Sequence, residues 1–169
     1  MRWALHVRSS LTAGTIGSIG DMLMQSRERS QSLQGNAEPA LDRARSARVA
    51  GFRALQAPIV DSAWRFFDAR FQARGGMLAA GVSGAAARAV CDQCLLAPPS
   101  IAGFFVFQGL FEGLGATESM DRARSSFAGA YIIAFPFWTC THMITFGVVQ
   151  PNWRVAWASV IAVCEGSSI

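Results

Sequence analysis

The stretch "SSFAGAYIIAFPFWTCTHMITFGVVQPNW", Ser125 to Trp153, decides the fold, because it carries no charged side chain apart from the titratable His142. A helix rises about 1.5 Å per residue, so about 20 residues cross the hydrocarbon core of a bilayer. The stretch exceeds that length. We therefore predict a transmembrane helix here.

A second uncharged stretch, "QCLLAPPSIAGFFVFQGLF", runs from Gln93 to Phe111 and is about as long as one span. Pro98 and Pro99 interrupt it, and a proline inside a helix removes a backbone hydrogen bond and clashes with the preceding turn. We expect a kink or short break there, shielded by neighbouring helices. With the small residues upstream, the pattern predicts one long, broken helical passage from about Gly76 to Leu114.

The composition also favours a membrane protein. Of the 169 residues, 51% are hydrophobic and 15% are charged, whereas about 25% are charged in a typical soluble domain. All fifteen basic residues are arginine, so the chain has no lysine for Schiff-base or P-loop chemistry. These arginines are scattered along the chain rather than clustered among aromatic residues, which argues against a nucleic-acid partner.

Three further segments are predicted helices, although they are less hydrophobic. They are Leu11 to Gln25 with the residues before it, Ala47 to Phe71, and a last helix after Pro151 that ends at Gly166. Charges on the second of them face the bundle interior or its ends, because each costs several kcal/mol in the middle of a bilayer. We expect an all-α, multi-pass transmembrane bundle with about four principal spans and proline-broken helices.

The whole chain, 1–169, is predicted to form a single membrane domain. Two polar segments, about 26–41 and about 115–124, are predicted loops. In a count of four spans both loops fall on the same side of the membrane, and both contain arginines. That side would be the positive side.

The first helix contains glycines at every third position, Gly14, Gly17 and Gly20. A dinucleotide-binding turn has the order G-x-G-x-x-G after a strand, and this segment has neither that order nor a preceding β-branched run. On a helix, glycines spaced in this way form a smooth strip against which another helix packs closely. We interpret them as packing residues.

The "CDQC" motif at Cys91 and Cys94 has the spacing of redox and zinc sites. A zinc site needs two further ligands at a similar spacing, and the histidines His6 and His142 stand alone; a thioredoxin-like site needs a preceding strand. We expect ordinary helix cysteines, no metal and no cofactor. A redox enzyme that uses these two thiols is kept as an alternative.

The first twenty residues contain Arg2, Arg8 and several hydroxyl groups, and they contain no acidic residue. This composition resembles a mitochondrial targeting signal, although the same residues run directly into an apolar helix. The segment indicates an organelle.

Several polar residues fall within the predicted helices and are candidates for the functional site. Burying them is costly unless they line water or pair with one another. One interpretation is a hydrated, charge-selective path, and the other is a set of interhelical pairs that hold the bundle together, for example a carboxylate with Arg48 or Arg88. The pore-lining or interhelical candidates are Asp21, Gln25, Asp61, Arg65, Asp92, Gln93 and His142.

Four stretches together resemble the Mpv-seventeen and peroxisomal membrane protein family. "LTAGTIGSIGDMLMQ" resembles its first signature, the stretch from Asp42 to Phe71 resembles the second, "DQCLLAP" resembles the third, and "FWTCTHMITFGVVQPNWR" resembles the signature near the C-terminus. The resemblance covers nearly the whole chain. Besides Asp21, Gln25, Asp92 and Gln93, the matching motif residues are Gly20, Asp42, Arg45, Arg48, Pro58, Asp68, Pro98, Trp138, Phe146 and Arg154.

The resemblance implies an integral protein of the mitochondrial inner membrane, or else of the peroxisomal membrane. It implies a channel or pore for small solutes with a role in organelle homeostasis, and it brings no catalytic residue, so we expect no enzyme. The expected partners are the lipid bilayer and small-molecule solutes, with a homo-oligomer possible and no nucleic acid. The alternative is a non-conducting membrane protein that stabilises partner complexes.

Overall fold

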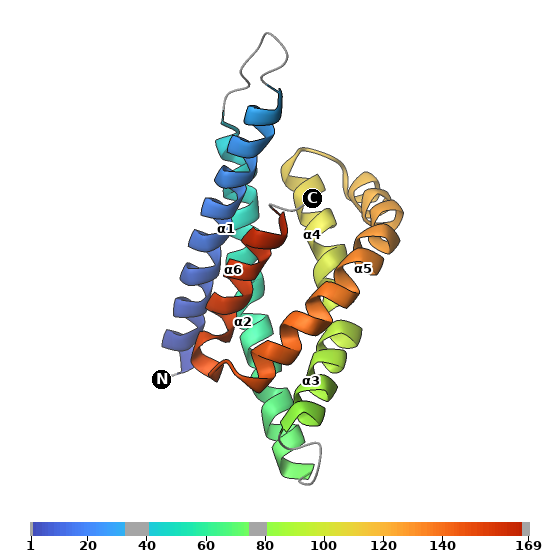
Figure 1. The fold of residues 1–169 in the computed structure, drawn as a ribbon. Coiled ribbons are helices and arrows are strands. Elements are labelled where there is room, and N and C mark those ends of the chain that lie inside the picture. The colour runs from blue at the N-terminus through green and yellow to red at the C-terminus, as the bar shows by residue number, and fades with distance from the viewer. Residues whose placement is uncertain (1, 33–40, 75–80, 167–169) are drawn as a thin grey trace. The chain divides into compact units, whose positions relative to one another are not determined.

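A computed structural model describes residues 2–32, 41–74 and 81–166 (Figure 1). Within these ranges every regular element is a helix, so the predicted all-α class is confirmed. The elements are α1 (Arg2–Ser32), α2 (Arg43–Arg74), α3 (Gly81–Leu95), α4 (Ala97–Phe111), α5 (Ala116–Gly147), the short 3-10 helix η2 (Pro151–Trp153) and α6 (Arg154–Gly166).

The contacts divide the chain into two compact units. The first comprises residues 1–58 and 155–169, and the second comprises 59–154. Helix α2 contributes to both, and Pro58, inside this helix, is the last residue of the first unit before the chain enters the second. The single domain over 1–169 stays a prediction.

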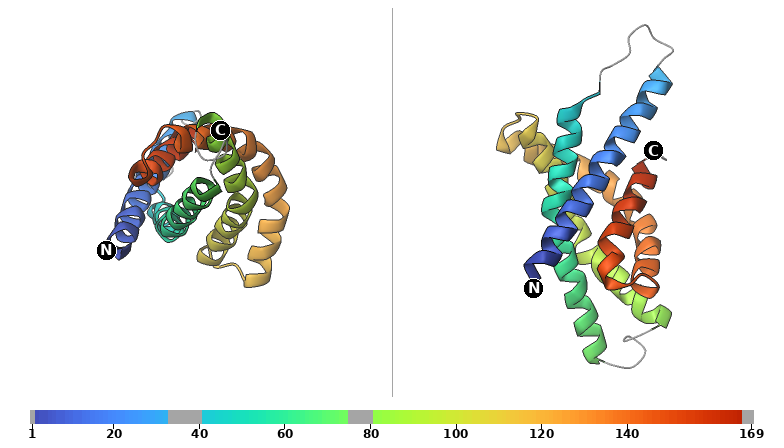
Figure 2. Two further views of the ribbon diagram at one scale, coloured as in Figure 1. Left: turned by 90° about the horizontal axis from the view of Figure 1, so that it is seen from below. Right: turned by 90° about the vertical axis from the view of Figure 1, so that its left-hand side faces the viewer.

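In the first unit, α1 lies beside α6 and beside the N-terminal half of α2 (Figures 1 and 2). Glycines allow this close approach. A Cβ atom at Gly14 would lie 3.3 Å from the Ala50 carbonyl oxygen of α2, and one at Gly20 would lie 2.5 Å from a methyl group of Val163 in α6. Their interpretation as packing residues agrees with these distances.

In the second unit, α3 and α4 pack against α5. The break that the prolines predict lies at Leu96, and Pro98 occupies the first turn of α4, where a missing N–H breaks no internal bond. The break is short, because the Leu96 amide still donates to the Asp92 carbonyl at 2.8 Å. The observed passage is 81–111, and the predicted start at Gly76 lies outside the described residues.

Two helical stretches within the described residues are long and apolar enough to cross a membrane, Gly81–Phe111 and Ala116–Gly147. Only 11% of the most apolar window of each is buried within the protein, whereas the core helix of a soluble protein is mostly buried. This agrees with a helical membrane protein. Helices α1 and α2 are equally long, but their charges lower their hydropathy, so composition supports two of the four predicted spans.

Both predicted loops are too long. Residues 26–32 continue α1, and α5 begins at Ala116, so residues 116–124 are helical. Arginine and glutamate are good helix formers, so the polar composition indicated exposure to solvent and not the end of a helix. The connection before α5 is the short turn 112–115, where Gly113 has a positive φ of 90° that glycine adopts without strain.

Candidate functional site

The second unit contains a buried carboxylate, Asp92 of α3, which is 4% exposed. Trp64 of α2 donates its indole N–H to one carboxylate oxygen at 2.5 Å. The other oxygen accepts a hydrogen bond from the side-chain amide of Gln93 at 3.1 Å and lies 3.2 Å from Nε2 of His142. Asp92 therefore joins α2, α3 and α5.

His142 is fixed by aromatic rings as well as by Asp92. The ring centroids of Trp64 and Trp138 both lie 5.3 Å from that of His142. Nε2 is the ring nitrogen of His142 that faces Asp92. The other ring nitrogen, Nδ1, and the side-chain oxygen of Gln93 are buried with no hydrogen-bond partner in the described structure.

A second carboxylate, the partly buried Asp68 of α2, interacts with two buried arginines. Arg154 donates to one oxygen at 2.5 Å and to the Val149 carbonyl at 3.1 Å. Arg88 of α3 lies 3.6 Å from the other oxygen. The Arg154 guanidinium also lies 5.1 Å from the ring centroid of Phe146, which in turn contacts Trp64, so aromatic contacts connect the two carboxylate groups.

A third carboxylate of this unit, Asp61, pairs with Arg65, one turn away on α2 and at a distance of 2.9 Å. Asp61 is 4% exposed, and Arg65 reaches the side-chain oxygen of Asn152 at 3.2 Å. Three carboxylates and three arginines of this unit balance in charge. The carboxylates are Asp61, Asp68 and Asp92, and the arginines are Arg65, Arg88 and Arg154, so the set is neutral when His142 is neutral.

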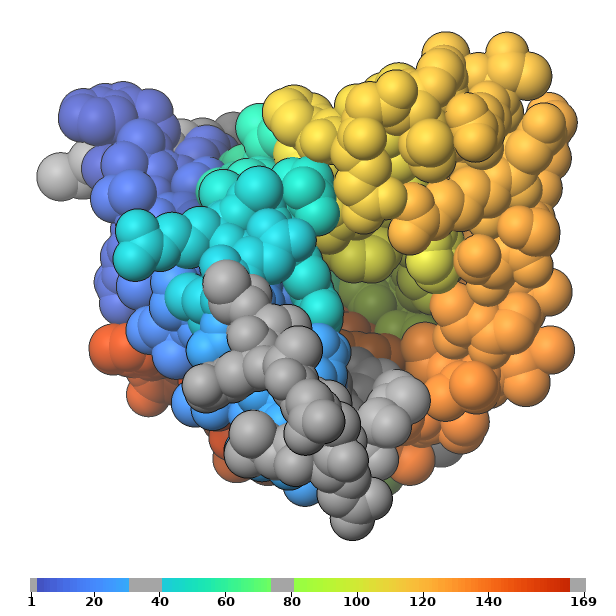
Figure 3. Space-filling model, turned by 90° about the horizontal axis from the view of Figure 1, so that it is seen from above, coloured from blue at the N-terminus to red at the C-terminus, as the bar shows by residue number. Residues whose placement is uncertain are grey.

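The first unit contains a separate network around Asp21 of α1, where the start of α2 lies against α1 (Figure 3). One Asp21 oxygen lies 2.9 Å from Nε of Arg45. The other accepts hydrogen bonds from the Ser46 hydroxyl and the Gln25 amide, each at 2.6 Å. This carboxylate is therefore fully partnered.

Gln25 extends this network to the start of α2. Its side chain accepts from the Asp42 amide at 2.7 Å and donates to the Asp42 carbonyl at 3.0 Å. Asp42 caps the helix, because its carboxylate accepts from the Arg45 backbone amide at 2.8 Å. Hydrogen bonds to Glu28 chiefly, and then the charge of Asp21, raise the pKa of Arg45 against the opposing effect of burial.

The seven candidate residues from the sequence therefore do not line one common path. Asp92, Gln93 and His142 lie together, Asp61 and Arg65 form a pair, and Asp21 and Gln25 lie together in the other unit. The family-motif residues follow the same division: Gly20, Asp42, Arg45 and Arg48 lie in the first unit, Pro58 inside α2, and Asp68, Pro98, Trp138, Phe146 and Arg154 in the second.

Several partners of these carboxylates were not predicted from the sequence. The sequence spacing could have identified Trp64 as a partner, because Asp61, Trp64 and Asp68 lie at i, i+3 and i+7 and so share one face of α2. No comparable spacing in the sequence indicates Ser46 or Glu28 as a partner. Arg88 was predicted as a partner for a carboxylate, and the structure shows that this carboxylate is Asp68.

The cysteine motif lies within α3, so no strand precedes it in the described chain, and Cys91 and Cys94 are not in a disulfide. Among residues 2–32, 41–74 and 81–166, no three histidine, cysteine or acidic side chains lie together as metal ligands would. The helical position removes the structural setting of a thioredoxin-like site.

Comparison with known proteins gives matches to part of the chain. Residues 109–167 match the model of the Mpv17 / PMP22 family. PXMP2/4 family protein 2 of Dictyostelium discoideum is 29% identical over 75 residues, which cover 44% of this chain and 39% of that protein. Protein SYM1 of Yarrowia lipolytica is 29% identical over 69 residues, which cover 41% and 34% respectively. The matches thus span less than half of either relative, and no solved structure matches.

Proposed function

We propose that this chain, whose residues 109–167 match the Mpv17 / PMP22 family model, passes small solutes across an organelle membrane. The membrane that we propose is the mitochondrial inner membrane, in preference to the peroxisomal membrane. Passage involves no chemical step, so the protein is not an enzyme.

The observation that carries this proposal is buried charge on the two apolar stretches. Arg88 and Asp92 lie on Gly81–Phe111 and His142 lies on Ala116–Gly147, and all three side chains are buried. Ionisable groups inside a membrane helix are costly, and they commonly mark a path for ions or solutes. Here they face the protein and not the lipid.

The pairing of these groups suggests how passage would be controlled. Asp92 holds side chains of α2 and α5 together, so a solute could pass it only after Trp64 or His142 moves away. Because three carboxylates balance three arginines, the path would discriminate weakly between anions and cations.

A second candidate is a non-conducting protein that stabilises partner complexes. The pairing itself favours it, because Asp61, Asp68 and Asp92 each contact a partner within the chain and need no water-filled path. In that case the pairs serve to fix the packing of the helices.

Conductance of the purified full chain in planar bilayers separates the two candidates. We propose to compare the wild type with Asp92→Asn, and with Asp121→Asn as a control, since Asp121 is an exposed carboxylate on α5. A channel predicts discrete openings whose ion preference changes in Asp92→Asn and not in the control. Silence from folded, inserted wild-type protein would instead support the structural role.

A further inference from the structure

The end of the first unit at which the C-terminus of α1 lies against the start of α2 carries a cluster of arginines. The described residues here, 26–32 and 41–48, include five arginines and two acidic residues. The two ranges lie at one level, because the side chain of Gln25 in α1 accepts a hydrogen bond from the backbone amide of Asp42 at 2.7 Å. We call these two ranges the basic hairpin end.

The two acidic residues of the basic hairpin end are already engaged by arginines. Glu28 lies 2.9 Å from Arg45, and Asp42 lies 4.0 Å from Arg48. These pairs account for two of the five arginines, so the cluster keeps an excess of positive charge.

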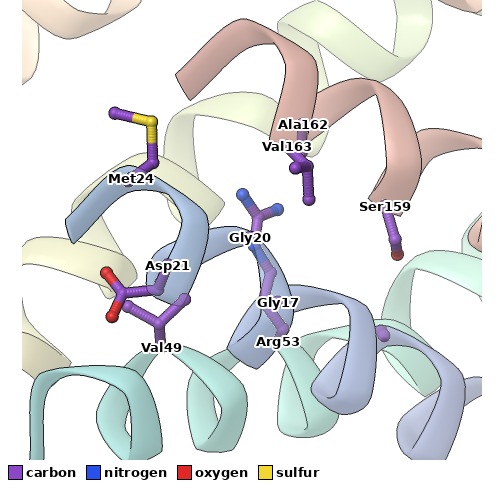
Figure 4. Close-up of a pocket in the computed structure, with 10 residues that line it drawn as sticks. Gly17, Gly20, Asp21, Met24, Val49, Arg53, Ser159, Ala162 and Val163 are labelled. Atoms are coloured by element: carbon purple, nitrogen blue, oxygen red, sulfur yellow. The ribbon is translucent and has the colours of Figure 1, made fainter. Parts of the chain in front are cut away.

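A further acidic residue close to this end, Asp21, faces the interior of the unit. Its side chain is buried, and together with Val49 of α2 it lines the pocket shown in Figure 4. Its oxygens contact Arg45, Ser46 and Gln25. Asp21 therefore does not neutralise arginines on the surface of the basic hairpin end.

Two arginines of the basic hairpin end, Arg27 and Arg43, have available guanidinium groups. Both residues are exposed, and neither side chain has a partner among residues 2–32, 41–74 and 81–166. Arg27 follows Gln25 by two positions and Arg43 follows Asp42 directly, so both lie within one helical turn of the contact that joins α1 to α2. The two guanidinium groups therefore belong to the same level of the molecule.

On α1, the basic hairpin end directly follows an exposed apolar surface. Ile19, Met22 and Leu23 are between 40% and 54% exposed. Leu23 and Arg27 are four residues apart, so they share one face of the helix and lie about 6 Å apart along its axis. An arginine one turn beyond exposed apolar side chains is typical of a membrane interface, where its stem covers apolar surface and its guanidinium reaches the head groups.

We propose that the basic hairpin end binds the head groups of anionic phospholipids through Arg27 and Arg43. A guanidinium presents its donors in a planar fork that matches the oxygens of a phosphate group. Clustered arginines beside a membrane helix attract anionic lipids. The exposed Leu23 favours a lipid over a soluble anion, because an acyl chain can cover it. This inference does not depend on whether the protein conducts solutes.

Native mass spectrometry of the full chain tests this proposal, in neutral detergent micelles doped with equal amounts of phosphatidylglycerol and phosphatidylcholine. We expect the protein to retain phosphatidylglycerol in preference. Arg27→Gln combined with Arg43→Gln should lower this preference by about tenfold or more, because each arginine near an anionic membrane surface contributes about fivefold. Replacing both by lysine keeps the charge but loses the fork, so it should lower the preference less.

The matched control combines Arg122→Gln with Arg124→Gln, which removes two exposed arginines that are already paired with Glu112 and Asp121. The control should keep the preference for phosphatidylglycerol. An equal loss in both glutamine double variants would indicate attraction to net charge alone and overturn the proposal. The absence of a preference in the wild type would overturn it as well.

Competition with a soluble polyanion distinguishes a lipid from an acidic protein as the partner. Poly-glutamate, added at the same concentration of negative charge as phosphatidylglycerol, should leave most of the retained lipid in place. Complete displacement of the lipid would identify acidic peptide as the better ligand of the basic hairpin end, which would contradict the proposal.

Discussion

Both units contain carboxylates paired with arginines, but these pairs have different structural roles in the two units. In the first unit, Asp21 binds a hydroxyl, an amide and the half-exposed Arg45, all near the junction of α1 and α2. In the second, the partly buried Asp68 binds the buried Arg154, a residue 86 positions away. The first arrangement completes the end of a helix, and the second joins helices that are distant in the sequence.

The two networks should therefore respond differently when one partner is removed. Polar groups near a helix end can regain water when a partner is removed. A buried arginine without its carboxylate has no such replacement. We therefore expect variants in the second unit to be more damaging than similar variants in the first.

The largest effect is expected for Asp68→Ala. It leaves Arg88 and Arg154 buried without their common partner, and such a loss costs about 3–5 kcal/mol of the free energy of unfolding. Chemical unfolding in detergent measures it. Asp121→Ala, which removes an exposed carboxylate paired with Arg124, should cost less than about 1 kcal/mol. Equal losses in both variants would show that the Asp68 pairs are not buried as described.

An intermediate effect is expected for Gly20→Ala in the first unit. The added methyl group would overlap the stiff side chain of Val163, so α6 must shift, at a cost of about 1–3 kcal/mol by thermal unfolding. Gly129→Ala is the matched control, because nothing lies within 4 Å of a Cβ at Gly129 in α5. That variant should be stabilised by about 0.5–1 kcal/mol, and destabilisation of it would contradict the account.

The smallest effect is expected for Asp42→Ala. The variant removes the cap from the Arg45 amide at the start of α2, which costs about 1 kcal/mol of the free energy of unfolding. Asp42→Asn should recover most of the loss, because asparagine caps a helix about as well. If asparagine does not restore stability, the charge of Asp42 and its neighbour Arg48, 4.0 Å away, matters more than the cap.

The sequence predicted what depends on local pattern. Hydropathy located the apolar helices, and the prolines at 98 and 99 located the break at Leu96. The glycine spacing predicted close packing against another helix, and the structure shows such contacts with α2 at Gly14 and with α6 at Gly20. Polarity was a poor guide to the ends of helices, because residues 116–124 are mostly exposed and yet helical, with only Ser119 and Ala123 of this range buried.

The pairing of the buried polar residues was not predictable to the same extent. Asp92, Gln93 and His142 were identified because charge inside an apolar helix is costly. Their partners depend on which helices meet, and the contact between Asp68 and Arg154 joins residues that no local pattern connects. The motif resemblance selected Asp68 and Arg154 separately, without indicating that they pair.

Helix α5 is expected to cross a membrane with His142 facing the protein interior. Spin labels in a cysteine-free background test it, at Ile133, which is 64% exposed in the middle of α5, and at the exposed Glu118 in its first turn. In proteoliposomes, the account predicts that oxygen dissolved in lipid relaxes the label at position 133, and that a water-soluble nickel chelate relaxes the label at 118. Efficient relaxation by the nickel chelate at position 133 would contradict it.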